Sequence, residues 1–147
     1  MKKSLMALLI LLFCINFNGF GQDTKVQQQV QTIRKTAYTR VLNLTDVEAQ
    51  QFWPVFDEMQ AKINEVKHKA KDERVNIAKN NLSDAQMEHA IDNLLTYEQQ
   101  GLDIKKKYYQ KFKKILPIRK VALLPRAEAE FKRDLLRIIK NKVDSEE

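Results

Sequence analysis

The sequence predicts an all-α protein, and three observations lead to that prediction. The chain has only three glycines and three prolines in 147 residues, which leaves little room for the turns of a sheet. Apolar residues recur at spacings of three and four over long stretches, the period of one face of a helix. Two of these stretches begin with a side-chain pattern that caps a helix N-terminus. Together these observations favour a few long helices.

Residues 1–21 have the features of a secretory signal and are set apart from the fold. MKK is a short basic segment, and the apolar run LMALLILLFCINF is too short for a comfortable membrane span. Gly19 and Gly21 are the small residues that a signal peptidase prefers, so cleavage is predicted after Gly21. A lipoprotein signal is disfavoured because Phe13, rather than a small residue, precedes Cys14. We expect an exported, periplasmic protein with a single helical domain over 22–147.

The composition of the mature chain limits the class of partner. Removing the signal takes the lone cysteine, Cys14, so no disulfide is expected. The net charge of +7 falls to +5 when Lys2 and Lys3 leave with the signal. An exported basic protein meets unfolded polypeptides and anionic lipid surfaces, and we expect no nucleic-acid partner.

Four helices are expected, at about 24–42, 45–80, 83–115 and 117–142. The second carries a long apolar stripe: Phe52, Val55, Phe56, Met59, Ile63, Val66 and Ala70. The third has its own stripe: Met87, Ile91, Leu94, Leu102, Tyr109, Phe112 and Leu116. Pro54 is expected to bend the second helix, and Pro125 to kink the fourth or delay its start, because proline lacks the backbone donor.

Three expected helix starts share a pattern of leucine, a helix-starting residue and a polar residue three positions later. Thr45 with Glu48, and Ser83 with Gln86, fit the capping box, in which each side chain satisfies the other residue's backbone N–H. The third start relies on proline, which suits the first turn of a helix. The motif residues are Leu44, Thr45, Glu48, Leu82, Ser83, Gln86, Leu116, Pro117 and Lys120.

Three segments read in order carry a family resemblance: AYTRVLNLTDVEAQQFWPVFDEM, KKKYYQKFKKILP and RAEAEFKRDLLRII. The chain resembles the Spy/CpxP superfamily of small exported helical proteins with LTxxQ motifs, in the form labelled sensor of ECF-type sigma factor. It departs from the motif at Glu48 and Lys120, which stand where glutamine is expected, and at Pro117, which stands for threonine. The resemblance implies long antiparallel helical hairpins forming a thin curved shell, commonly a dimer, whose concave face touches client proteins.

Three functions follow as expectations. The first is an ATP-independent chaperone that holds unfolded or misfolded envelope proteins. The second is a stress-signalling adaptor that binds the outer domain of a membrane sensor or anti-sigma factor, and the third is a metal-responsive periplasmic regulator. An enzyme is not expected, since Ser83 serves as a cap and His68 and His89 lie on different helices without a catalytic motif. No cofactor and no small-molecule substrate are expected.

The metal hypothesis depends on two short clusters. His68 and Asp72 are four residues apart on one helix, and Glu88, His89 and Asp92 span a little more than one turn. Lysines on both sides of His68 oppose a cation. Solvated helix faces explain both clusters more simply, so no metal ligand is assigned.

A basic segment interleaved with aromatics gives the candidate client surface. Such a mixture attracts an acidic unfolded chain at long range and contacts its apolar groups at short range. The alternative is that Tyr109 and Phe112 belong to the core and the lysines are merely solvated. Trp53 lies about 100° from Phe52 on the helical wheel, at the border of the apolar stripe. The candidate contact residues are Trp53, Lys105, Lys106, Tyr108, Lys111, Lys113 and Lys114.

Overall fold

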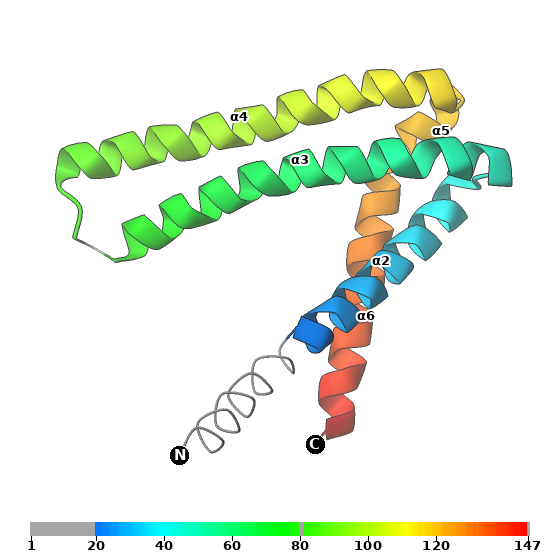
Figure 1. Cartoon of the computed structure of the whole chain (residues 1–147), viewed down its shortest axis with the longest axis horizontal. Helices are drawn as coiled ribbons and strands as arrows, with labels where there is room; N and C mark the ends of the chain where they lie inside the picture. The colour runs from blue at the N-terminus through cyan, green and yellow to red at the C-terminus, as the bar shows by residue number, and fades with distance from the viewer. Residues whose placement is uncertain (1–19, 80, 147) are drawn as a thin grey trace, which may run out of the picture. The chain divides into compact units, whose positions relative to one another are not determined.

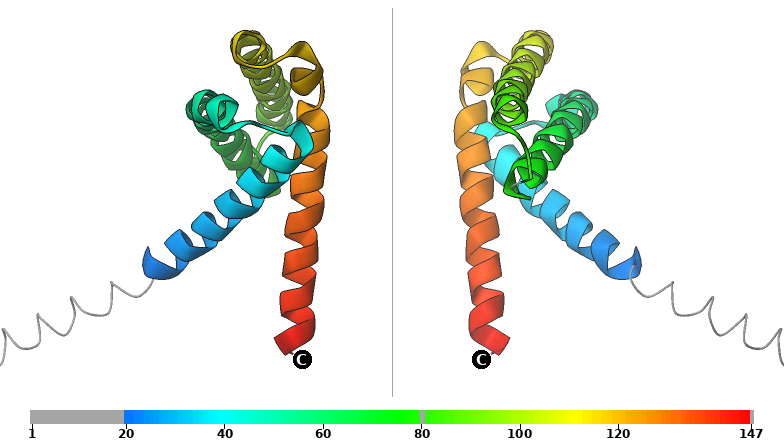
Figure 2. Two further views of the ribbon diagram at one scale, coloured as in Figure 1. Left: turned by 90° about the vertical axis from the view of Figure 1, so that its right-hand side faces the viewer. Right: turned by 90° about the vertical axis from the view of Figure 1, so that its left-hand side faces the viewer.

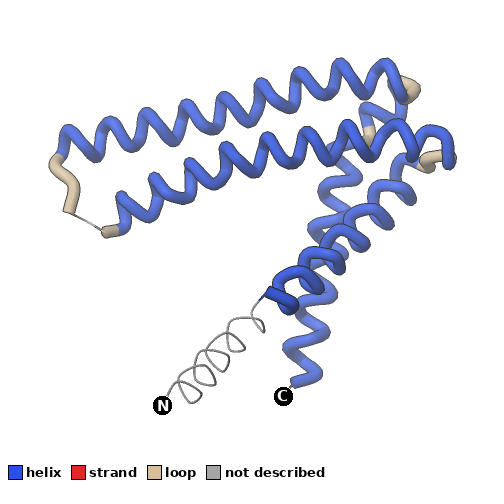
Figure 3. The backbone as a smooth tube through the Cα atoms, in the orientation of Figure 1, coloured by secondary structure: helices blue, strands red, loops and turns tan. Residues whose placement is uncertain are grey.

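The protein was analysed as a computed structural model that describes residues 20–79 and 81–146, with side chains over 24–79 and 81–141. The described residues form helices joined by short loops, and no strand occurs among them (Figure 3). The prediction of an all-α fold is therefore confirmed. The helices are α2 (Phe20–Leu42), α3 (Asp46–Ala78), α4 (Asp84–Ile115), α5 (Ile118–Ala122) and α6 (Leu124–Glu146).

The helices form two compact units. The first unit pairs α2 with α6, and the second runs from Leu44 to Ala122 and holds α3, α4 and α5.

In the second unit, α3 and α4 form a long antiparallel hairpin (Figures 1 and 2). Its core positions alternate at spacings of three and four, the heptad period of a coiled coil. On α3 the buried and half-buried core residues are Phe52, Phe56, Met59, Ile63, Val66, Ala70, Glu73 and Ile77. On α4 they are Met87, Ala90, Leu94, Tyr97, Gly101, Ile104, Tyr108, Phe112 and Ile115.

The inward face of α4 differs from the predicted stripe. Ile91 and Leu102 were assigned to the core, but they are 51% and 52% exposed, whereas Ala90 is 1% exposed. The predicted stripe follows the bulky apolar residues of this helix. The core row instead passes through Ala90, which is fully buried, and Gly101, which is half-buried.

Both capping boxes close at the starts of the hairpin helices. The Thr45 hydroxyl accepts from the Glu48 N–H at 3.2 Å, and the Glu48 carboxylate accepts from the Thr45 N–H at 2.9 Å. Ser83 and Gln86 make the same pair of bonds at 3.3 and 2.9 Å. These bonds satisfy N–H groups that have no partner within the helix. Helix α3 then continues through Pro54 to Ala78.

In place of one helix over 117–142, the structure has two helices separated at Leu123. Pro125 lies in the first turn of α6. In a continuous helix, its ring would clash with the carbonyl four residues earlier, and its missing N–H would leave that carbonyl without a donor. In a first turn the missing donor costs nothing. Of the two expected effects of Pro125, the chain shows the delayed start.

In the first unit, α2 and α6 run antiparallel and separate toward the start of α2 and the end of α6 (Figure 2). The side chains buried between them are Ala37, Tyr38, Leu42, Leu124, Ala127 and Phe131. The Tyr38 hydroxyl donates to Glu128 at 2.6 Å, and the Arg34 guanidinium lies 4.5 Å from the centre of the Phe131 ring. Asn43 ends α2 with a φ of 47°, a left-handed conformation that asparagine tolerates at a helix C-terminus.

Candidate functional site

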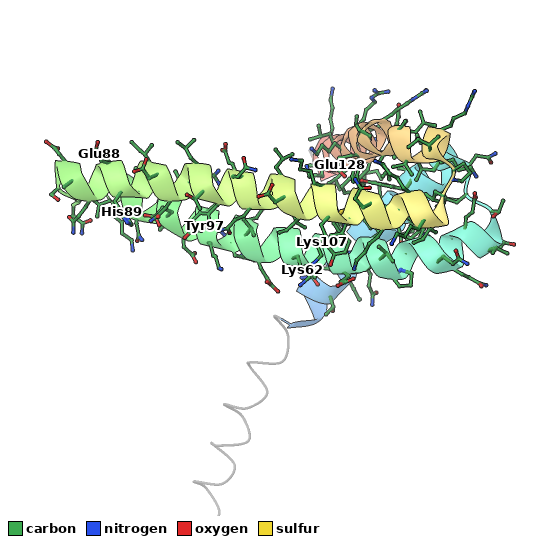
Figure 4. The ribbon with its side chains drawn as sticks, turned by 90° about the horizontal axis from the view of Figure 1, so that it is seen from above. Lys62, Glu88, His89, Tyr97, Lys107 and Glu128 are labelled. Atoms are coloured by element: carbon green, nitrogen blue, oxygen red, sulfur yellow. The ribbon has the colours of Figure 1, made fainter. Side chains whose placement is uncertain are left out.

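Helix α4 separates its charges along its length. Residues 84–103 carry Asp84, Glu88, Asp92, Glu98 and Asp103 with no lysine or arginine, and residues 104–115 carry six lysines with no carboxylate. Figure 4 labels Glu88 and His89 toward one end of the helix and Lys107 toward the other. The lysine-rich half is antiparallel to the first turns of α3, where residues 46–58 hold four carboxylates and no basic residue. The hairpin therefore pairs opposite charges along its length, and opposite charges attract at close range.

One ion pair joins these halves of the hairpin, and a second joins α5 to the start of α3. Lys111 Nζ lies 3.0 Å from the Glu58 carboxylate and 4.4 Å from the centre of the Tyr108 ring. Lys120 Nζ lies 2.6 Å from the Glu48 carboxylate, with both side chains largely shielded. Lys105, Lys106, Lys107, Lys113 and Lys114 are exposed and take part in none of the ion pairs found among the described residues. These five lysines are called the basic face of α4.

The Glu48–Lys120 pair joins two of the helix-start motifs. Glu48 closes its own capping box and also accepts a hydrogen bond from Lys120. The hydrogen bond from Lys120, followed by the one from the Thr45 N–H, lowers the pKa of Glu48 below its usual value of 4.5. Both residues stand where the LTxxQ pattern has glutamine, and their charges are complementary. Their opposite charges meet across 72 positions of sequence.

Aromatic side chains pack at the lysine-rich end of the hairpin. The centre of the Phe52 ring lies 5.0 Å from the ring centres of both Trp53 and Phe112. Trp53 also contacts Phe56 edge to face, with ring centres 5.5 Å apart. Phe52, Phe56 and Phe112 are buried, and Trp53 is half-buried. The FWPVF segment is thus core and border side by side, as its helical wheel indicated. Pro54, which follows Trp53 in this segment, is exposed.

Tyr108 does not lie where a client contact requires it. We expected it on the surface and Tyr109 in the core, but Tyr108 is 0% exposed and Tyr109 is half-buried. The Tyr108 hydroxyl is buried beside the Glu58 carboxylate, although the two do not meet full hydrogen-bond geometry. Burial raises its pKa to about 12, and the nearby Glu58 carboxylate adds to the rise. The heptad register explains why Tyr108 is buried instead of Tyr109, since Tyr108 follows Ile104 by four residues along the seam.

The other candidate contact residues are accessible to different degrees. Lys105, Lys106, Lys113 and Lys114 are exposed on the basic face, whereas Lys111 is half-buried in its ion pair with Glu58. Trp53 is half-buried and already in contact with two phenylalanines. Exposed lysines are therefore the accessible part of the predicted surface.

An exposed apolar row on α4 was missed by the sequence reasoning. Ile91, Leu95 and Leu102 lie beside the seam and are each more than half exposed. The predicted stripe placed two of them, Ile91 and Leu102, in the core because they are bulky and apolar. A heptad count through Met87, Ala90, Leu94, Tyr97 and Gly101 is the signal that finds this row.

Neither metal cluster assembles a ligand set. No group of three or more His, Cys, Asp or Glu side chains with metal-site geometry occurs among the residues whose side chains are described. His68 and Asp72 are both exposed. The His89 Nδ1 atom lies 3.2 Å from the Asn93 amide nitrogen, which in turn donates to Glu73 at 3.4 Å. These contacts form a polar cluster near the turn of the hairpin.

Within residues 20–79 and 81–146, none of the helices combines the length and the apolar character that a membrane span needs. The predicted signal falls almost entirely outside the described residues.

No family model matches the chain, and neither a curated protein nor a solved structure matches it.

Proposed function

We propose that the protein is an exported, ATP-independent chaperone that binds unfolded or misfolded envelope proteins, as the resemblance to the Spy/CpxP superfamily implies. One observation carries the proposal: α4 presents five lysines outside the ion pairs of the hairpin at one end and an exposed row of apolar side chains toward the other. The apolar row consists of Ile91, Leu95 and Leu102. A surface of this kind needs neither a nucleotide nor a catalytic group.

The two parts of the surface act at different distances. The basic face attracts an acidic unfolded chain from several ångströms away, and it does so less at high ionic strength because salt screens exposed charges. The apolar row then contacts the side chains that an unfolded client exposes, which buries apolar area on both partners. Both contacts are individually weak, so a client is released when it folds and buries its own apolar groups.

Aggregation suppression tests the proposal directly. The mature chain, residues 22–147, is mixed with a denatured acidic protein at near-stoichiometric amounts without nucleotide, and light scattering is followed. We expect suppression that weakens as salt is raised. An absence of suppression over a wide range of ratios contradicts the chaperone function.

Matched variants separate the two contacts. Lys106→Glu with Lys113→Glu reverses two charges of the basic face, and Lys69→Glu with Lys71→Glu makes the same change in net charge at exposed positions of α3. The first pair should slow capture of the client, and the second should do so much less. Leu95→Gln should shorten the lifetime of the complex, since 60% of this side chain is exposed and its loss costs little stability. Equal effects of the two charge pairs would show that only net charge matters.

A second candidate function is the signalling adaptor, and a surface on the other helix pair favours it. Leu136 and Ile139 are 67% and 51% exposed on α6, three residues apart and therefore on neighbouring parts of one face. A preformed apolar face suits a folded partner, such as the outer domain of a membrane sensor or anti-sigma factor, or a second copy of the chain in a homodimer. Leu136→Glu should abolish such binding in a pull-down with the outer domain while leaving aggregation suppression intact.

The metal-responsive regulator receives no support from side-chain geometry in the described residues. Calorimetry with zinc, copper and nickel tests it. Heat from one-to-one binding that disappears in His89→Ala would restore that hypothesis.

A further inference from the structure

An open groove runs along one side of the α3–α4 hairpin, and it shares only Leu102 and Lys105 with the proposed client surface. It encloses about 280 Å³. Its apolar lining comes from both helices: Ile63, Val66, Ala70, Tyr97, Gly101 and Leu102. Helix α3 carries the lining from Ile63 to Arg74, about 16 Å at a rise of 1.5 Å per residue. The groove therefore extends along about three turns of α3.

Small residues at the seam open this groove. Ala70 and Gly101 occupy core positions of the facing helices, where longer side chains would fill the space between them. A Cβ atom built on Gly101 meets nothing within 4 Å. Close packing therefore does not require glycine there, although glycine inside a helix is less favourable than alanine. The backbone at this position leaves space that the protein does not itself occupy.

The rim of the groove is positively charged. Lys67 and Arg74 on α3 and Lys105 on α4 line it, against one carboxylate, Glu98. None of these four residues belongs to an ion pair found among the described side chains. All four are exposed, so the cations can reach a ligand at the groove mouth while their aliphatic stems cover its sides. Apolar lining and a rim of net positive charge match a ligand with an alkyl chain and an anionic head.

We propose that this groove binds a single-chain anionic amphiphile, a fatty carboxylate, with its alkyl chain along Val66, Ala70, Gly101 and Leu102 and its head group among the rim cations. The alkyl chain gains from leaving water, in proportion to the length that the groove covers. The head group keeps its charge because Lys67, Arg74 or Lys105 replaces part of its hydration. This inference does not depend on the chaperone function.

Calorimetric titration of the mature chain with laurate, kept below its micelle concentration, tests the inference. We expect saturable one-to-one binding. Dodecyl maltoside, which has an equal chain and an uncharged head, should bind at least about tenfold more weakly if head-group charge contributes 1.4 kcal/mol or more. Equal affinity for the two amphiphiles overturns the proposal. Binding that appears only with vesicles of anionic phospholipid also overturns it, because the groove accommodates one chain.

Variants locate the ligand. Gly101→Leu puts a side chain into the open space and should weaken laurate binding by about tenfold or more. Each CH₂ group of the ligand that is displaced from the groove lowers the affinity several-fold. Lys67→Gln with Lys105→Gln should weaken laurate but leave dodecyl maltoside unchanged. The matched control is Lys71→Gln with Lys106→Gln, which removes the same charge from exposed positions outside the groove.

The rim variants keep the test decisive if Gly101→Leu proves unstable. Their substitutions are at exposed positions, where folding is little affected. Laurate affinity that drops equally in the rim pair and in its control would show that net charge, rather than the groove, attracts the ligand. That result, or unchanged affinity in a folded Gly101→Leu protein, contradicts the assignment.

Discussion

Replacing Gly101 with alanine should stabilise the hairpin, and the structure allows the gain to be worked out. Gly101 lies in the interior of α4, fourteen residues from its end at Ile115, and its backbone has no positive φ that would demand glycine. Alanine is about 0.8–1.0 kcal/mol better than glycine inside a helix. The new methyl group meets no heavy atom within 4 Å, so no clash offsets this gain.

The expected change is therefore an increase of about 1 kcal/mol in the free energy of unfolding. For a cooperative unit of 60–100 residues this raises the thermal midpoint by about 4–8 °C. Circular dichroism at 222 nm, followed through urea and thermal unfolding, measures both quantities. The urea midpoint should rise with little change in slope, because the surface exposed on unfolding hardly changes.

Gln100→Ala is the matched control for Gly101→Ala. Gln100 is exposed one position earlier on the same helix, and this change should stay within about 0.5 kcal/mol of the original protein. A Gly101→Ala protein that is less stable than the original would refute the reasoning. It would mean that the space beside Gly101 is closed in solution, and the proposed ligand groove would lose its physical basis.

Three further predictions concern the cap, the Glu48–Lys120 ion pair and the buried tyrosine. Ser83→Ala should lower the free energy of unfolding by about 1 kcal/mol, measured by urea unfolding, because the Gln86 N–H loses its acceptor. Glu48→Gln and Lys120→Gln should each destabilise the hairpin more than the double change does, since either single change leaves one charge unpaired; a strictly additive double-mutant cycle argues against the pairing. The pKa of Glu48 is lowered in the fold, so its contribution is complete above about pH 4.5 and is lost as the pH falls further; Glu48→Gln should flatten this acid limb. Burial raises the pKa of Tyr108 to about 12, so its contribution is complete below pH 10 and is lost between about pH 10 and 12; alkaline unfolding that Tyr108→Phe leaves unchanged would contradict this.

The helices themselves were predictable because their signals are local. The start of α3 depends on Thr45 and Glu48, three residues apart, and the start of α4 depends on Ser83 and Gln86. The delayed start of α6 follows from the missing donor of Pro125. Such interactions form within one turn of helix, so they can be recognised in any sequence that contains them.

The face that each helix buries was less predictable. A helical wheel at 3.6 residues per turn and a heptad at 3.5 differ by about 20° per two turns, and the difference accumulates along a helix as long as α4. Between Met87 and Tyr108 this drift reaches about 60°, which favours Tyr109 over Tyr108 on the wheel. Ile91 was preferred to Ala90 because it is the bulkier apolar residue, although Ala90 is the buried one. The partner helix decides between the two periods, because only its surface determines where a small residue can approach closely.

The sequence by itself determined that the chain is all-α, where its capped helices begin, and that lysines and carboxylates are segregated along α4. Tertiary structure alone decided which of those charges meet. Glu48 and Lys120 lie 72 positions apart, and only the hairpin brings them within 2.6 Å. The same is true of the groove, because Ala70 of α3 and Gly101 of α4 line one space only when the two helices pair. Local propensity sets the elements, whereas a contact between distant residues depends on a register that the whole interface selects.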